Sequence, residues 1–232
     1  MMSRGKRYQE AEKKLDRDKF YSVEEAVGIL KELAPTKFNQ SVDVSISLGV
    51  DPKRSDQMVR GSSKLPYGTG KTKKVLVFCE PEKEEEARTA GADFVGSQDL
   101  LDKISKGWLG FDYCISTPSM MRNIARLGKI LGPRGLMPSP KSGSVTDNLS
   151  VAVKDAKEGK LDFKMDKFGC LNVAVGKISF SREQISKNIE TFFASLLQLR
   201  PQSLKGRFVK SITISTTMSP GCKINLPKEF QL

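Results

Sequence analysis

The chain has 232 residues, of which 38% are hydrophobic and 28% are charged, so its composition is that of a globular protein with one large or two modest domains. Lys and Arg number 39 against 27 Asp and Glu, and the net charge of +12 favours a polyanionic partner such as RNA, DNA or an anionic membrane. The absence of His excludes Ser-His and Cys-His nucleophiles, and the absence of a long apolar stretch excludes a transmembrane helix.

Residues 1–19 are polar and charged in both signs, which predicts a solvated, partly helical arm that is too charged for a signal peptide. We therefore expect a soluble cytoplasmic protein. Ser22 and Glu25 form a capping box at the start of a helix, and Pro35 is expected to stop it. The apolar face of this helix consists of Ala26, Val27, Leu30 and Leu33. Apolar and polar residues then alternate over residues 41–48, which predicts a half-buried antiparallel strand with one wet face.

Residues 61–72 are rich in turn formers and resemble a crossing between two domains. Beyond them, short apolar strands alternate with helices. The strands are expected at residues 74–78, 93–95 and 111–116, and the helices at about residues 82–90 and 99–106. This alternation predicts a parallel sheet that is covered by helices on both faces, which is a small doubly wound unit.

Ser119 is expected to cap a further helix, which Gly132 ends. Its apolar face consists of Met120, Ile124, Leu127 and Leu131. Prolines and glycines in residues 132–143 predict a stiff, exposed loop, and Thr146 is expected to begin a helix that reaches about Glu158.

The alternation typical of an antiparallel sheet then returns. It occurs twice, at Leu161, Phe163 and Met165 and at Leu171, Val173 and Val175. Ser181 and Gln184 form a second capping box, and a last strand that begins near Val209 ends at residues 216–219. The helix after this capping box carries Ile185, Ile189, Phe192, Leu196 and Leu199 on one face.

The simplest assembly is an α/β protein of two domains. Residues 1–69 and 157–232 form a split α+β domain with an antiparallel sheet, and residues 70–156 form an inserted, doubly wound, Rossmann-like domain. The expected hinge consists of glycines at the two crossings, Gly68, Gly70 and Gly159. Residues 1–69 include 13 basic and 10 acidic residues, residues 70–156 include 13 and 11, and residues 157–232 include 13 and 6. The split domain therefore holds +10 of the +12 charges, and we expect the anion-binding surface chiefly there.

Four cysteines lie far apart in the sequence, with no Cys-x-x-Cys pair and no His that could complete a zinc site. They are Cys79, Cys114, Cys170 and Cys222. We expect reduced, mostly buried thiols, and neither a metal nor a cofactor.

Residues 68–72, Gly-Thr-Gly-Lys-Thr, end like a phosphate-binding P-loop. They are the basis of an alternative hypothesis, in which the insert is a nucleotide-binding α/β enzyme or switch. A P-loop requires Gly at position 65 and a helix after Thr72, so that backbone N–H groups converge on phosphate. Position 65 is Leu and the next segment has the pattern of a strand, so the sequence favours a basic, flexible hinge.

Two regions of the sequence are candidates for contact with nucleic acid. Residues 113–146 contain no acidic residue and carry the cations Arg122, Arg126, Lys129, Arg134 and Lys141. The first three fall on one helical face, which is typical of a phosphate-binding ridge and also of an ordinary solvated face. The second region is the strand end with Ser211, Ser215, Thr216, Thr217, Met218 and Ser219. Its hydroxyls suit ribose and phosphate and its Met suits a sugar or base face, although such a strand is more often only a strand.

Three segments, in order along the chain, resemble one protein family. They lie in residues 36–78, beginning Thr-Lys-Phe-Asn-Gln-Ser-Val-Asp-Val, in residues 131–141, Leu-Gly-Pro-Arg-Gly-Leu-Met-Pro-Ser-Pro-Lys, and in residues 215–218, Ser-Thr-Thr-Met. From about residue 20 to residue 225 the chain is similar to the bacterial form of large-subunit ribosomal protein one, the family of the mobile stalk beside the tRNA exit site.

The resemblance implies a non-enzymatic, ribosome-bound protein that is monomeric when free. Its split domain would bind large-subunit ribosomal RNA through one end of the sheet, and its insert would move on a hinge to help deacylated tRNA leave the exit site. Repression of its own messenger RNA is a further implied role. The RNA contacts implied by matching positions are Lys37, Phe38, Asp166, Lys167, Ser211, Thr217 and Met218. Ser219 stands where the family usually has Gly, which puts close approach of RNA to the backbone there in question.

Overall fold

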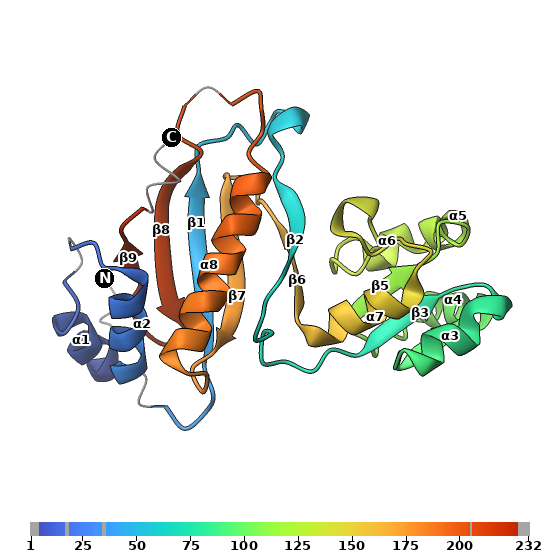
Figure 1. Cartoon of the computed structure of the whole chain (residues 1–232), viewed down its shortest axis with the longest axis horizontal. Helices are drawn as coiled ribbons and strands as arrows, with labels where there is room; N and C mark the ends of the chain where they lie inside the picture. The colour runs from blue at the N-terminus through green and yellow to red at the C-terminus, as the bar shows by residue number, and fades with distance from the viewer. Residues whose placement is uncertain (1–4, 17–18, 34–35, 205, 227–232) are drawn as a thin grey trace. The chain divides into compact units, whose positions relative to one another are not determined.

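The computed structural model of the chain describes residues 5–16, 19–33, 36–204 and 206–226. The chain divides into two compact units (Figure 1). Unit 1 comprises residues 1–70 and 162–232, and unit 2 comprises residues 71–161. Whether the two units behave as domains that move on a hinge stays a prediction, and each unit is described by itself.

Unit 1 begins with two helices, α1 (Lys6–Lys13) and α2 (Val23–Glu32). The helical part of the expected arm is α1, but Ala11 and Leu15 are buried, so this segment is anchored and not wholly solvated. Helix α2 starts at the expected capping box, in which the Ser22 hydroxyl accepts the Glu25 N–H and the Glu25 carboxylate accepts the Ser22 N–H. The remainder of the arm, at residues 1–4 and 17–18, and the expected stop at Pro35 lie outside the described residues.

The main sheet of unit 1 is antiparallel and has the order β7-β1-β8-β9. Its strands are β1 (Ser41–Leu48), β7 (Cys170–Lys177), β8 (Val209–Thr216) and β9 (Cys222–Ile224). The sequence predicted the first three, whereas β9 was missed because three residues are too few to show a period. Helix α8 (Arg182–Gln198) begins at the second predicted capping box. It packs on β7 while α2 packs on β8 and β9, and both helices bury the apolar face of the sheet (Figure 1).

A second, two-stranded sheet pairs β2 (Arg60–Lys64) with β6 (Lys160–Lys164). The prediction that residues from Gly61 onwards form only a turn-rich crossing is therefore wrong for β2. Its residues Gly-Ser-Ser have little intrinsic preference for strands, so tertiary pairing decides their conformation. Gly61 is required by close packing, because a Cβ there would lie 2.4 Å from Cδ1 of Leu199. On β6, Phe163 packs edge-on against Phe192 of α8 with ring centroids 5.2 Å apart.

Unit 2 contains the predicted parallel sheet, and its strand order is β4-β3-β5. Its strands are β3 (Val75–Phe78), β4 (Phe94–Gly96) and β5 (Tyr113–Ser116). Helices α3 (Glu84–Thr89) and α7 (Leu149–Glu158) cover the face that carries Val75 and Val77. Helix α4 (Gln98–Ser105) and the segment around Leu127 cover the opposite face, which carries Leu76 and Phe78. Unit 2 is therefore a doubly wound layer structure.

The predicted continuous helix from Ser119 to Leu131 is wrong. The structure has α5 (Met121–Ile124), a 3₁₀ turn at Ala125–Leu127 and α6 (Gly128–Leu131), and the Ser119 side chain does not cap them. Gly128 lies inside this stretch, and glycine weakens a helix interior because it loses the most backbone freedom on folding. The apolar positions Met120, Ile124, Leu127 and Leu131 are nevertheless buried, as predicted.

The segment before α7 also differs from the prediction. Thr146 does not begin this helix, which starts at Leu149. Instead, residues 144–146 extend the parallel sheet, because the Ser116 N–H donates to the Ser144 carbonyl and the Thr146 N–H donates to the Ser116 carbonyl, each at 3.0 Å. Pairing with β5 therefore takes precedence over the local preference for a helix.

The loop at residues 132–143 is held by serines. The Ser144 hydroxyl accepts the Ser139 N–H at 2.8 Å and lies 2.9 Å from the Ser142 hydroxyl. Ser142 and Ser144 are buried, whereas Arg134 and Lys141 are exposed. The stiffness expected from prolines therefore also has a hydrogen-bonded cause.

All four cysteines are free thiols, and Cys79, Cys114 and Cys222 are buried, as predicted. Burial raises the pKa of Cys79 and of Cys222 to about 11 each, and it raises the pKa of Cys114 as well. Because the thiolate is the reactive form, these three thiols are inert at neutral pH. Cys170 is partly exposed. Among the described residues, no helix is long and apolar enough to cross a bilayer.

Candidate nucleic-acid interface

The main sheet of unit 1 has one apolar and one polar face. Along β1, buried residues alternate strictly with partly exposed ones, because successive side chains point to opposite sides. The exposed positions of β1 and of its neighbours β7, β8 and β9 form a surface that we call the polar face. It consists of Ser41, Asp43, Ser45, Ser47, Cys170, Asn172, Ala174, Ser211, Thr213, Ser215 and Lys223.

Cross-strand register places the hydroxyls of the polar face in rows. Ser45 lies between Asn172 and Thr213, and Thr213 lies beside Lys223. At one corner the Lys177 ammonium donates to the Ser41 hydroxyl at 2.9 Å. Small hydroxyl side chains on the face of a sheet allow close approach of a sugar-phosphate backbone and offer both donors and acceptors to it.

One end of the polar face carries Thr217 and Met218. The Thr217 N–H donates to the Ser41 carbonyl and the Thr217 hydroxyl accepts the Ser41 N–H, both at 3.2 Å. Thr217 therefore continues the pairing of β8 with β1 by one residue. Met218 follows at the turn, where 47% of its side chain is exposed. We call this end of the sheet the Met218 end.

Gln40 connects the Met218 end to the loop before β1. Its side chain is 1% exposed; its Oε1 accepts the Met218 N–H and its Nε2 donates to the Thr36 hydroxyl, both at 2.9 Å. The loop that is fixed in this way presents Lys37 and Phe38 to solvent, with Phe38 52% exposed. Sequence reasoning missed Gln40, because its partner Met218 lies 178 positions away in the chain.

The opposite end of the polar face carries a tight turn between β6 and β7. The Asp166 carboxylate accepts the N–H groups of Phe168 at 2.8 Å and of Cys170 at 2.7 Å, so Asp166 holds the turn in shape. Lys167 and Phe168 are exposed at its tip, and 87% of Phe168 is accessible. Sequence reasoning missed Phe168, although a lone aromatic in a polar turn is a usable signal. We call this end the Phe168 end.

The predicted contact residues therefore do not gather at one end of the sheet. Lys37, Phe38, Ser215, Thr217, Met218 and Ser219 lie at or near the Met218 end, whereas Asp166, Lys167 and Ser211 lie at the Phe168 end. Strand β1 joins the two ends, and the six-residue step from Ser41 to Ser47 corresponds to roughly 20 Å. The predicted residues are thus divided between two ends of the sheet, and docking of RNA through one sheet end stays a prediction.

The hydroxyls of two predicted contact residues, Thr216 and Ser219, are directed toward the protein and not toward solvent. Thr216 points into the core with 3% of its surface exposed, and its hydroxyl oxygen has no hydrogen-bond partner among the described residues. The Ser219 hydroxyl accepts the Thr216 N–H at 2.9 Å and donates to the Pro220 carbonyl at 3.0 Å. Ser219 thus closes the turn that presents Met218, and its backbone does not adopt a positive φ.

The segment that resembles a P-loop has a different structure. Gly68 and Gly70 adopt positive φ angles of 65° and 70°, and the chain then enters strand β3 instead of a helix. The buried Asn188 side chain accepts the Tyr67 N–H at 3.1 Å and donates to the Gly68 carbonyl at 3.0 Å. No helix N-terminus is available for phosphate here, so the alternative of a nucleotide-binding enzyme or switch loses its basis.

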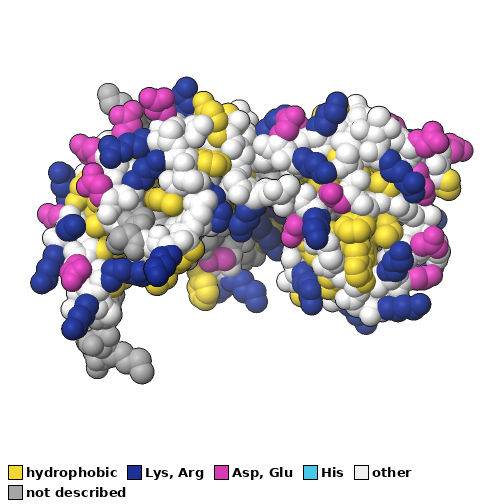
Figure 2. Space-filling view, turned by 90° about the horizontal axis from the view of Figure 1, so that it is seen from below, with side chains coloured by type: hydrophobic (Ala, Val, Ile, Leu, Met, Phe, Trp, Pro, Cys, Tyr) yellow, Lys and Arg dark blue, Asp and Glu magenta, His cyan; other side chains and the backbone are white. Residues whose placement is uncertain are grey.

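The second candidate surface lies in unit 2. Its five cations are exposed, and none of them forms an ion pair with a described residue. They are Arg122, Arg126, Lys129, Arg134 and Lys141. Because the helix is interrupted, a single ridge no longer follows from helical spacing. Figure 2 shows Lys and Arg side chains on the visible face of both units with Asp and Glu among them, so charge alone does not single out a site.

Comparison with known proteins gives a consistent result. The sequence model of the "Ribosomal protein L1p/L10e family" matches residues 30–220. The "Large ribosomal subunit protein uL1" of Protochlamydia amoebophila (strain UWE25) is 50% identical over 221 residues, which cover 95% of this chain and 94% of the relative. The protein of the same name from Chlamydia pneumoniae is 50% identical over 225 residues, which cover 97% of both chains.

Replacement of Thr216 by Val should stabilise unit 1. The change removes a buried hydroxyl that has no partner and keeps the shape of the side chain, so the free energy of unfolding should rise by about 1 kcal/mol. Thr217→Val is the matched control, because it removes the acceptor of the Ser41 N–H and should lower the free energy of unfolding. Urea denaturation measures both, and a less stable Thr216→Val variant would show that the hydroxyl has a partner.

Replacement of Gln40 by Leu should loosen the Met218 end. The change places an apolar side chain at a buried position and leaves the Met218 N–H and the Thr36 hydroxyl without their partner, so the free energy of unfolding should fall by about 1–3 kcal/mol. Asn39→Ala removes exposed hydrogen bonds to Ser179 next to it, and its effect in urea denaturation should be smaller. Equal effects of the two substitutions would argue against the connecting role of Gln40.

Proposed function

The chain belongs to the ribosomal protein L1p/L10e family, and from this membership we propose that it is a component of the large ribosomal subunit that binds ribosomal RNA through the polar face of unit 1. Its place is then on cytoplasmic ribosomes. Proteins of this family are structural and not enzymes, so the chain binds and positions RNA without making or breaking a bond.

The observation that carries the proposal is the pair of similar tips at the two ends of the polar face. Each end presents an exposed Lys followed by an exposed Phe, namely Lys37 and Phe38 at one end and Lys167 and Phe168 at the other. Lysine neutralises phosphates, and an aromatic ring stacks on unpaired bases. A partner that reaches both tips must extend over roughly 20 Å, which suits folded RNA better than a mononucleotide.

Charge in the C-terminal part of the chain supports the same surface. No acidic residue occurs between Thr191 and Lys228, a stretch that includes β8 and β9. Lys210 and Lys223 are exposed there, next to the hydroxyls of β8. An RNA backbone on the polar face would therefore meet cations at its edge, and Asp43 is the one acidic residue among those that form this face.

We further propose that unit 2 is an inserted, mobile domain that assists release of deacylated tRNA from the exit site. The chain enters and leaves unit 2 near Gly70 and Gly159, which adopt positive φ angles of 70° and 118°. Glycine adopts these conformations without steric strain, so the crossings are suited to a hinge. The five exposed cations of unit 2 are available to the phosphates of tRNA.

The same polar face supports a regulatory role. A protein that recognises a folded ribosomal RNA element also binds a messenger RNA that presents the same shape, since recognition rests on backbone and ribose contacts. We propose that the chain is monomeric when free and that it represses translation of its own message in this way.

Simultaneous replacement of Thr217 by Val and Met218 by Ala should weaken binding to a large-subunit ribosomal RNA fragment by at least about 1–3 kcal/mol, because hydroxyl bonding and packing on RNA are both lost. Filter binding measures the affinity. Val151→Ala, an exposed apolar residue on α7, is the matched control and should leave the affinity unchanged. Unchanged affinity of the double variant would reject the Met218 end as an RNA contact.

Cys170 offers a test in the native chain. It lies on the polar face opposite Ser47 and is partly exposed, so iodoacetamide should alkylate it before the three buried thiols. Bound ribosomal RNA should slow this alkylation, which mass spectrometry follows over time. Alkylation of Cys170 at the same rate with and without saturating RNA would place the RNA elsewhere. Denatured chain, in which all four thiols react, serves as the reference.

A further inference from the structure

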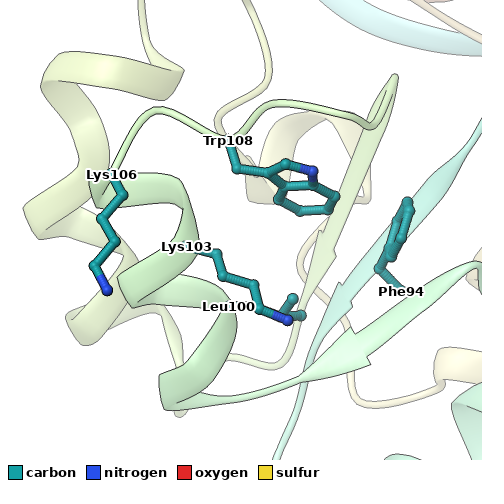
Figure 3. Close-up of a pocket in the computed structure, with 5 residues that line it drawn as sticks. All are labelled: Phe94, Leu100, Lys103, Lys106 and Trp108. Atoms are coloured by element: carbon teal, nitrogen blue, oxygen red, sulfur yellow. The ribbon is translucent and has the colours of Figure 1, made fainter.

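Unit 2 has an open pocket that the proposed function does not use. The lining residues are Phe94 of β4, Leu100 and Lys103 of α4, Lys106 directly after α4, and Trp108 (Figure 3). The pocket has a volume of about 460 Å³. We call it the Trp108 pocket. A cavity of this size lies in the range that small organic ligands occupy.

The aromatic walls of the pocket are fixed from behind. Trp108 meets Phe94 edge-on with ring centroids 4.8 Å apart, and its indole also packs on Phe111 at 5.8 Å. Gly110 leaves room for the indole, because a Cβ at this position would lie 3.1 Å from the indole Nε1. The rings contact the buried core of unit 2 around Leu101 and Ile104. A stacking partner would therefore meet rings that are already in place.

The polar groups at the pocket are cations and one neutral donor. Lys103 and Lys106 form no ion pair with any described residue, and the indole N–H of Trp108 donates to none of them. In Figure 3 the Lys103 side chain extends along α4 toward the space beside the two rings, while Lys106 lies farther from them. Carboxylates are not among the lining residues. The pocket thus combines an apolar, aromatic interior with a positive rim.

We propose that the Trp108 pocket receives one unpaired base of an RNA strand, with the adjoining phosphate at Lys103. A base is flat and stacks on aromatic or aliphatic walls, and its phosphate supplies the negative charge that two unpaired ammonium groups favour. An apolar peptide would fill the interior but leave this charge unused. The inference rests on the proposed function only in that the partner is RNA, and it adds a contact in unit 2 that is separate from the polar face.

The chain provides its own probe, because Trp108 is its only tryptophan. A single-stranded hexa-adenylate is titrated into the full chain while Trp108 fluorescence is recorded. Stacking of adenine on or beside the indole should quench the emission saturably. An abasic ribose-phosphate hexamer of equal charge should bind this pocket about tenfold more weakly, since only the base stacks. Equal quenching by both hexamers, or no quenching by hexa-adenylate, overturns the proposal.

Matched variants separate the pocket from the rest of the surface. Lys103→Ala should weaken the hexa-adenylate quenching by about fivefold through loss of one phosphate contact. Lys154→Ala removes an exposed lysine on α7, which covers the other face of the parallel sheet, and should leave the quenching unchanged. Phe94→Leu removes one ring and preserves apolar volume, so it should weaken quenching in a chain whose circular dichroism shows that it is folded. Equal effects of Lys103→Ala and Lys154→Ala would reject the pocket in favour of nonspecific charge attraction.

Failure of this inference can be told apart from failure of the proposed function. The Thr217→Val, Met218→Ala double variant should lose affinity for the ribosomal RNA fragment and still show full quenching by hexa-adenylate. A wild-type chain that binds the ribosomal RNA fragment without any quenching by hexa-adenylate contradicts the pocket alone. A chain that shows quenching but does not bind the fragment contradicts the polar face alone.

Discussion

The alternation of side chains along β1 is the constraint on which the structure of unit 1 depends. Val42, Val44 and Ile46 enter the core, and the residues between them remain at the surface. Because β1 pairs with β7 on one side and β8 on the other, its register fixes the register of both neighbours. A shift by one residue would turn every serine of β1 into the core, so burial of the apolar set specifies the polar face as well.

The same pairing explains how segments that are far apart in the sequence form one surface. Strand β1 carries the loop of Phe38 at its start and reaches the turn of Phe168 at its end, and β8 brings Met218 back beside Ser41. The fold therefore provides a rigid platform whose two ends are held by buried or backbone-directed polar groups. Gln40 does this at one end and Asp166 at the other. Pre-organised tips lower the entropic cost of binding a large partner.

Local signals in the sequence predicted the elements that depend on local interactions. Both capping boxes formed as expected, since a Ser and a Glu or Gln three residues apart satisfy each other. Strand β2 could not be predicted, because only its pairing with β6 and the contact of Gly61 with Leu199 make it a strand. Gln40 and Asn188 were missed for a related reason, since a buried amide acquires its role from partners more than 100 positions away. The strand end at residues 211–219 was a candidate from its residue types, whereas Lys37, Phe38, Asp166 and Lys167 came from family resemblance alone. The separation of these residues into two ends required the strand register.

The most direct test of RNA binding by the polar face is ultraviolet crosslinking of the full chain to its large-subunit ribosomal RNA fragment, with the crosslinked peptides identified by mass spectrometry. We expect crosslinks in peptides that contain Phe38, Phe168 and Met218, because these side chains stand exposed at the two ends of the polar face. Crosslinks confined to residues 71–161 would contradict the assignment of ribosomal RNA to unit 1.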